Sequence, residues 1–149
     1  MNKNCLPPTA KRVQSQTNPC INNEIKNNTI NRINTYKNGS TEMLNDKINE
    51  LNNEWDIERI IETNAAIIVF LCSFLGLRRS KWFLITGVVG FYLLTHALQG
   101  WCLPLQFLRR MHIRTADEIN IEKTAYKSAR GDFAQQTDNA SEMYTNAEK

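Results

Sequence analysis

The most restrictive feature of the sequence is a run of 27 residues, Trp82–Leu108, that contains no lysine, arginine, aspartate or glutamate. About 20 mainly apolar residues are enough for a helix to cross a bilayer. No other part of the 149-residue chain is apolar enough to cover so long a run inside a soluble domain. The run therefore predicts a membrane-spanning helix.

A second uncharged run, Thr63–Leu77, precedes it; extended back to Ile60, the stretch reaches 18 residues and includes one charged residue, Glu62. At about 1.5 Å per residue, a helix of that length just spans the hydrocarbon core. Only residues 78–81 separate the runs, and so short a link requires two antiparallel helices. The predicted domain is a transmembrane helical hairpin over residues 60–108, with spans of about 60–77 and 82–100.

Two alternatives to a spanning hairpin are open from the sequence. The apolar runs could dip into the membrane from the cytoplasm without crossing it, because the link between them carries three positive charges. They could instead form the shared core of a soluble helical oligomer. The spanning hairpin is preferred over the soluble core, because 27 uncharged residues exceed what so small a chain can bury.

Amphipathic helices are predicted on both sides of the hairpin, which makes the fold class an all-α membrane protein. Apolar residues before the hairpin recur at steps of four, three and four, so they share one helical face. These are Leu44, Ile48, Leu51 and Trp55. Their helix is expected to continue unbroken into the first span, and the face is interpreted as lying on the membrane or on neighbouring helices. After the hairpin, Thr115-Ala-Asp-Glu118 is a capping box that predicts a helix over Ala116–Arg130.

The flanking segments complete the predicted organisation. Small and polar residues dominate both ends of the chain, as is typical of disorder. Seven lysines and arginines near the spans lie on the terminal sides, against three in the link, and this bias favours cytoplasmic termini. The predicted segments are a disordered tail over 1–17, an amphipathic arm over 18–59, an interfacial segment and cytoplasmic helix over 109–133, and a disordered tail over 134–149.

Five polar residues are expected at the cytoplasmic end of the hairpin. Folding the two runs about position 79 places Glu62 at the depth of His96 and Arg59 opposite Gln99. Ionisable groups in membrane segments are costly and mark candidate sites. The group could hold an anion or a proton, but hydrogen bonding between the two helices is the preferred interpretation. Its members are Arg59, Glu62, Asn64, His96 and Gln99.

Cys102 is a second candidate site. It follows the hydrophobic helix and lies near Arg109 and Arg110, where positive charge could stabilise a reactive thiolate. Inert packing is the preferred alternative. The four cysteines, Cys5, Cys20, Cys72 and Cys102, show no metal-ligand spacing, so neither a metal nor another cofactor is expected.

Thr86, Gly87 and Gly90 form a patch of small residues on the second helix, here called the glycine notch. Small residues let membrane helices approach closely. The notch could seat the first helix of the hairpin or a second copy of the chain, and a homo-oligomer is expected. The net charge of +3 is too small to indicate nucleic acid as a partner.

Several short motifs resemble the YgaP-like inner-membrane family. The Gly-Trp-Cys element that ends at Cys102 is the most specific of them. Leu103 separates Cys102 from Pro104, whereas many members place a proline directly after the cysteine. The motifs lie within residues 50–133, and the resemblance extends more weakly over 20–50. They are Trp55-Asp-Ile-Glu-Arg59, Glu62-Thr-Asn-Ala-Ala66, His96-Ala-Leu-Gln-Gly-Trp-Cys102, Leu108-Arg-Arg110 and Arg130-Gly-Asp-Phe133.

This resemblance implies a two-helix, multi-pass protein of the bacterial inner (cell) membrane. The charge bias described above adds the expectation that both termini lie in the cytoplasm. The best-known member joins the hairpin to a rhodanese sulfurtransferase domain. The 59 mostly polar residues before this hairpin are too few for such a domain, so sulfurtransferase activity is not expected to carry over.

The predicted function is that of a scaffold or accessory protein that self-associates in the lipid bilayer. No catalytic motif is present, and no enzyme activity is predicted. The alternative is a sulfur-handling or small-anion transport protein that uses Cys102 and the group Arg59, Glu62 and His96. The sequence does not identify a protein partner.

Overall fold

A computed structural model of the protein describes residues 6–133. Within this range every regular element is helical, which confirms the all-α fold class. The predicted disordered tail over 134–149 lies outside the described residues, as do residues 1–5. The helices are η1 (Thr9–Lys11), α1 (Arg12–Ser15), α2 (Pro19–Tyr36), α3 (Thr41–Asn53), α4 (Ile57–Gly76), α5 (Trp82–Gln99), α6 (Leu103–Arg110) and α7 (Ala116–Arg130).

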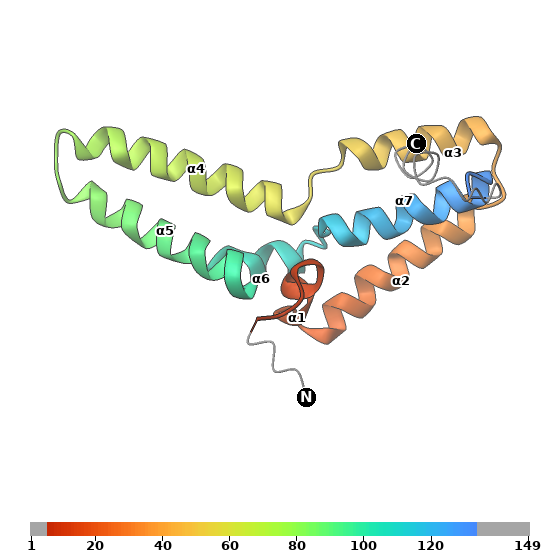
Figure 1. Ribbon diagram of the computed structural model, residues 1–149, viewed down its shortest axis with the longest axis horizontal. Coiled ribbons are helices and arrows are strands. Elements are labelled where there is room, and N and C mark those ends of the chain that lie inside the picture. Colours follow the sequence, from red (N-terminus) through yellow and green to blue (C-terminus); the bar gives the residue numbers. More distant parts are fainter. Residues whose placement is uncertain (1–5, 134–149) are drawn as a thin grey trace, which may run out of the picture. The chain divides into compact units, whose positions relative to one another are not determined.

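The described chain divides into two compact units. The hairpin unit contains residues 6–26 and 55–117, and the arm unit contains residues 27–54 and 118–133. In the hairpin unit, α4 and α5 run antiparallel and side by side, joined by a short turn (Figure 1). By length and composition, both reach what a membrane crossing requires, which confirms the predicted helical hairpin.

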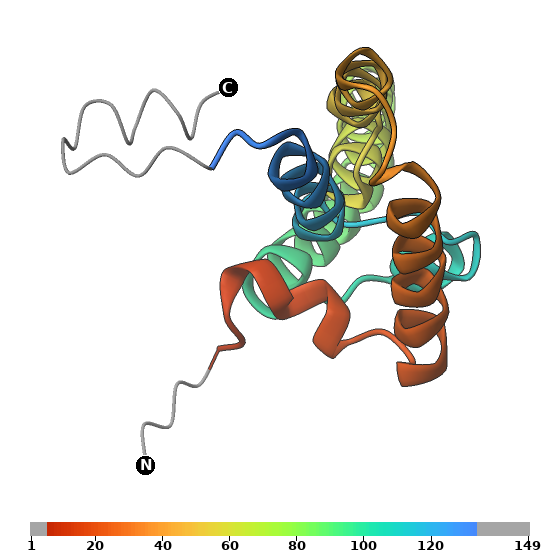
Figure 2. The ribbon, with the colours of Figure 1, turned by 90° about the vertical axis from the view of Figure 1, so that its right-hand side faces the viewer.

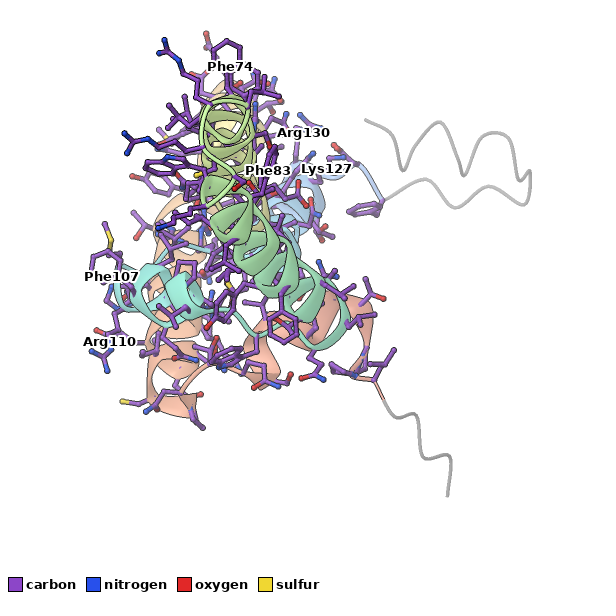
Figure 3. The ribbon with its side chains drawn as sticks, turned by 90° about the vertical axis from the view of Figure 1, so that its left-hand side faces the viewer. Phe74, Phe83, Phe107, Arg110, Lys127 and Arg130 are labelled. Atoms are coloured by element: carbon purple, nitrogen blue, oxygen red, sulfur yellow. The ribbon has the colours of Figure 1, made fainter. Side chains whose placement is uncertain are left out.

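The two long helices direct large apolar side chains outward. Phe70 is 70% exposed and Leu84 is 76% exposed, and Phe74 projects outward at the end of the hairpin (Figure 3). Soluble proteins rarely leave a large contiguous apolar surface in water. The same surface matches the hydrocarbon core of a bilayer, so the exposure pattern agrees with membrane-spanning helices.

α3 and α4 are separate helices, and the prediction of one unbroken helix was wrong. α3 ends at Asn53 and α4 begins at Ile57. Between them, Asp56 caps α4, because its Oδ1 accepts a hydrogen bond from the backbone N–H of Arg59 at 2.7 Å. A capping aspartate has extended backbone and satisfies an N–H that has no partner within the helix. The periodicity of apolar residues carries no information about a capping residue, so it did not predict the break between α3 and α4.

Residues 6–17 are folded, whereas the sequence predicted a disordered tail over 1–17. η1 and α1 lie in this segment, and Val13 is 1% exposed. Val13 belongs to an apolar cluster with Ile57, Ile61, Cys102 and Leu105. The side-chain amide of Gln106 also donates a hydrogen bond to the backbone carbonyl of Gln16 at 2.7 Å. Val13 is the only residue of this segment in the apolar cluster, and a single apolar residue gives no periodic signal in the sequence.

In the arm unit, parts of α2, α3 and α7 pack around a small apolar core (Figure 2). The four-three-four spacing correctly places its α3 residues on one buried face. Trp55 continues that spacing in the sequence, but it is exposed because α3 has already ended. The core residues are Leu44, Ile48 and Leu51 from α3 and Ile119 and Tyr126 from α7, with Ile33 and Tyr36 of α2 packed against them.

A buried carboxylate accompanies this core. Glu122 of α7 is buried, and its two oxygens accept hydrogen bonds from Nε and Nη2 of Arg32 at 3.1 Å each. The hydroxyl of Tyr126 donates a further bond to Glu122 at 3.0 Å. Burial and this hydrogen bond both raise the pKa of Tyr126, so its phenol stays protonated. The cluster has the form of a structural ion pair that joins α2 to α7.

Candidate functional site

The five polar residues predicted to gather at one end of the hairpin have different environments. His96 is 4% exposed, whereas the other four are exposed. The guanidinium of Arg59 lies over the ring of Trp55, 4.5 Å from its centroid. The side-chain amide of Asn64 donates to the backbone carbonyl of Ile60 in its own helix at 2.9 Å. Within residues 6–133, no hydrogen bond or ion pair joins the five side chains to one another.

Helical phase is the physical reason for this separation. Folding the two runs about position 79 matches residues by their depth along the helix axes. Successive residues also rotate around each axis, and depth does not include this rotation. Arg59 and Glu62 are three residues apart and share one side of α4, whereas Asn64 leaves the helix on another side. Equal depth in the membrane therefore does not by itself bring the five side chains together, and of the other four only Glu62 acts electrostatically on His96.

The buried end of α5 is the polar site that the structure does contain. Neither ring nitrogen of His96 has a hydrogen-bond partner among the described residues, and both are buried. Arg12 and Glu62 are the charged groups that act on His96 electrostatically. Arg12 also has a buried Nε atom without a partner, while its Nη1 donates to the carbonyl of Thr9 at 3.1 Å. These nitrogen atoms could hold a water molecule or a small anion.

Arg12 is the residue of this site that the sequence reasoning missed. It lies in the segment that was predicted to be disordered. Gly100 explains how α1 reaches the end of α5, because a Cβ atom at position 100 would lie 2.4 Å from the backbone of Arg12. The backbone φ of Gly100 is also +77°. The sequence offered one signal for this contact. Gly100 stands at the C-terminal end of a hydrophobic helix, where a glycine allows another backbone to approach closely.

We expect His96→Leu to leave the protein at least as stable as the wild type. A buried polar group without a partner costs about 1–3 kcal/mol, and an apolar side chain of similar size removes that cost. Thermal unfolding in detergent measures the effect, with Gln99→Leu on the exposed surface of the same helix as the control. A clear loss of stability in His96→Leu alone would show that the imidazole has a bound partner.

Cys102 is buried rather than presented to solvent. It is 2% exposed and shares the apolar cluster of Val13. Burial raises the pKa of its thiol, and a backbone hydrogen bond from Leu105 opposes this only in part. The guanidinium of Arg109 donates to the carbonyl of Ile113 at 3.1 Å and to Oδ1 of Asn22 at 2.8 Å. These features favour inert packing over a reactive thiolate.

An apolar cavity of about 360 Å³ lies inside the hairpin unit between α4, α5 and α6. Asn64 also lines it, but the amide nitrogen of Asn64 is already bonded to its own helix. Among the described residues, no group of three metal-ligating side chains occurs here or elsewhere. The residues that shape the cavity include Ile61 and Ala65 of α4, Leu93 of α5, Phe107 and Leu108 of α6, and Cys102.

The glycine notch lies largely outside the packing of the hairpin. A Cβ atom built on Gly87 or Gly90 would meet no atom within 4 Å. Thr86 is partly buried, and its hydroxyl oxygen is shielded from solvent without a partner among the described residues. The close approach within the hairpin occurs instead at Gly76, where a Cβ atom would lie 2.9 Å from the ring of Phe83. The two glycines of the notch are therefore open to a further helix.

The comparisons with known proteins identify the hairpin segment. Residues 51–118 match the family "Inner membrane protein YgaP-like, transmembrane domain". The match contains α4, α5 and α6 together with Cys102, and it confirms the resemblance that the sequence motifs indicate. The motif Arg130-Gly-Asp-Phe133 and residues 20–50 lie outside it. Neither the curated proteins nor the solved structures gave a significant match.

Proposed function

The chain carries a YgaP-like inner-membrane transmembrane domain over residues 51–118, and from this premise we propose that it is a scaffold or accessory protein that self-associates through α5. The hairpin holds the protein in the bilayer. The arm unit gives it a folded polar part outside the membrane-spanning helices. No enzymatic step is required of it.

The open glycine notch is the observation that supports this proposal. Gly87 and Gly90 leave space along one side of α5, and Gly87 also lines a shallow groove on this helix. The groove is lined by apolar side chains that include Phe83, Leu84 and Phe91. Association of membrane helices depends on close van der Waals packing at small residues. A second copy of α5 would use space that the hairpin itself leaves empty.

The proposed orientation places both termini in the cytoplasm. Basic residues on the terminal sides of the hairpin outnumber those in its turn. Cys20 is exposed in α2 and lies on the N-terminal side of the hairpin. A membrane-impermeant maleimide should therefore label Cys20 in inverted vesicles and leave it unlabelled in sealed right-side-out vesicles. Labelling in right-side-out vesicles and not in inverted ones would reverse the assigned orientation.

We expect Gly87→Ile and Gly90→Ile to weaken self-association about fivefold or more, since a side chain that blocks close packing costs about 1–3 kcal/mol. The measurement is energy transfer between donor-labelled and acceptor-labelled protein in vesicles, at several protein-to-lipid ratios. The dyes are attached to Cys20, the exposed cysteine among the described residues.

Ala66→Ile is the matched control, because Ala66 is exposed on α4 and the change adds a side chain to the other helix of the hairpin. Energy transfer in this variant should equal that of the wild type. If the wild type gives no more transfer than randomly placed monomers, the self-association proposal fails.

The second candidate function is handling of a small anion. It is favoured by the buried nitrogen atoms of Arg12 and His96 that have no partner among the described residues. A small anion that binds there would raise the unfolding temperature of the wild type but not that of His96→Leu. Anion flux into vesicles that is equal for wild type and His96→Leu would exclude a transport role for this site.

A further inference from the structure

We propose that the apolar cavity between α4, α5 and α6 binds one acyl chain of an anionic membrane phospholipid, whose headgroup lies beside Arg110. The proposal goes beyond self-association and does not depend on it. It rests on the lining of the cavity, on the outer face of α6 and on the charge at the end of that helix.

The lining of the cavity fits a hydrocarbon chain. Apolar side chains from three helices surround it, and Cys102 contributes a protonated thiol. A volume of about 360 Å³ is at the lower end of the range of about 300–1,000 Å³ for small-molecule pockets. The space is too small for a further helix, which is about 10 Å or more across with its side chains. One flexible chain is the occupant of matching size and polarity.

The outer face of α6 places the cavity at the surface of the bilayer. Three large apolar residues, Leu103, Phe107 and Met111, are exposed at four-residue steps along this helix and its end. A short helix with such a face lies in the interface, with its apolar side among the acyl chains. Phe107 belongs both to this face and to the cavity wall, so the cavity meets the acyl region of the lipid.

The charge beside this face selects the lipid. Arg110 is exposed and leaves α6 on the same outer side as Phe107 (Figure 3). Arginine donates several hydrogen bonds in a geometry that matches phosphate oxygens. Arg109 is buried and bonded within the hairpin unit, which leaves Arg110 as the headgroup contact. The occupant is therefore a phospholipid of the bilayer rather than a soluble apolar molecule.

The test uses the full chain in nanodiscs that contain phosphatidylglycerol with a photoactivatable group near the end of one acyl chain. Cross-links in the wild type should concentrate on peptides that carry Ala65, Phe107 and Leu108. Ala65→Phe fills the cavity. In this variant, the cross-link yield on the cavity peptides should fall to the yield measured on peptides that face the surrounding lipid. Ala66→Phe, on the exposed side of the same helix, should retain the pattern of the wild type.

A second variant tests the headgroup contact without changing the core. Arg110→Gln should reduce the preference for phosphatidylglycerol over phosphatidylcholine about fivefold, the effect of about one basic residue near a membrane surface. Two results would overturn the proposal. One is cross-linking spread evenly over α4 and α5 in the wild type, and the other is a cavity cross-link that persists in Ala65→Phe. Because the yield is measured per chain, it is independent of whether the protein self-associates.

Discussion

Arg109→Ala is expected to destabilise the hairpin unit by about 3 kcal/mol, which is among the largest effects for a single substitution. Arg109 is 0% exposed. Its Nη1 donates to the carbonyl of Ile113 at 3.1 Å, and its Nη2 donates to Oδ1 of Asn22 in α2 at 2.8 Å. Removing the buried guanidinium leaves these partly buried acceptors without their donor and opens a cavity beneath α6. Unfolding by heat in detergent measures the loss.

Arg110→Ala is the matched control, because it removes the same side chain from the next position of the same helix. Arg110 is exposed, and surface substitutions of this kind usually change stability by less than about 0.5 kcal/mol. If the two variants lose stability equally, the effect comes from charge at the end of α6 rather than from the hydrogen bonds of Arg109 to Ile113 and Asn22.

This pair also shows what the sequence could and could not predict. Arg109 and Arg110 have the same side chain and adjacent positions, so composition and charge count treat them alike. In the alternative interpretation of Cys102 as a reactive thiol, both contribute the positive charge that stabilises a thiolate. Neighbouring residues on a helix point in different directions, and the structure turns one arginine into the interior and the other outward. Only the tertiary contacts of Asn22 and Ile113 distinguish them.

The hairpin itself was predictable because membrane insertion is governed by the length and apolarity of a continuous run. Trp82 begins α5 as expected, and α7 has the predicted bounds Ala116–Arg130. Apolar run length and helix-capping residues can each be recognised within a single segment of the sequence. The folded N-terminal segment depends instead on Val13 meeting residues far along the chain. The polar site at His96 depends on the same contact through Arg12, so it was predicted only in part.

Gly100→Ala is expected to release the N-terminal segment from the end of α5. Gly100 has a φ of +77°, and a left-handed conformation costs a residue with a side chain about 1–2 kcal/mol. A new Cβ atom would also lie 2.4 Å from the backbone of Arg12. Backbone atoms cannot turn aside as a flexible side chain can, so α1 must move away. If α1 moves away, Val13 also loses its burial, which raises the cost of the substitution by about a further 1.5–3 kcal/mol.

Gly131→Ala separates the two causes. Gly131 has a φ of +93°, but a Cβ atom there would meet no atom within 4 Å. This variant carries the conformational cost without the collision. Only Gly100→Ala should therefore detach α1, even if both variants lose some stability.

The thiol of Cys102 reports the detachment directly, because Val13 and Cys102 share one apolar cluster. In a variant whose other cysteines, Cys5, Cys20 and Cys72, are replaced by serine, maleimide should label Cys102 faster after Gly100→Ala than after Gly131→Ala. Hydrogen exchange of residues 9–17 should accelerate in the same variant. Equal labelling rates and equal exchange would mean that the position of α1 does not depend on the missing side chain at Gly100. The N-terminal segment would then be held by its hydrogen bond to Gln106 and by the ion pair of Lys11 with Asp117.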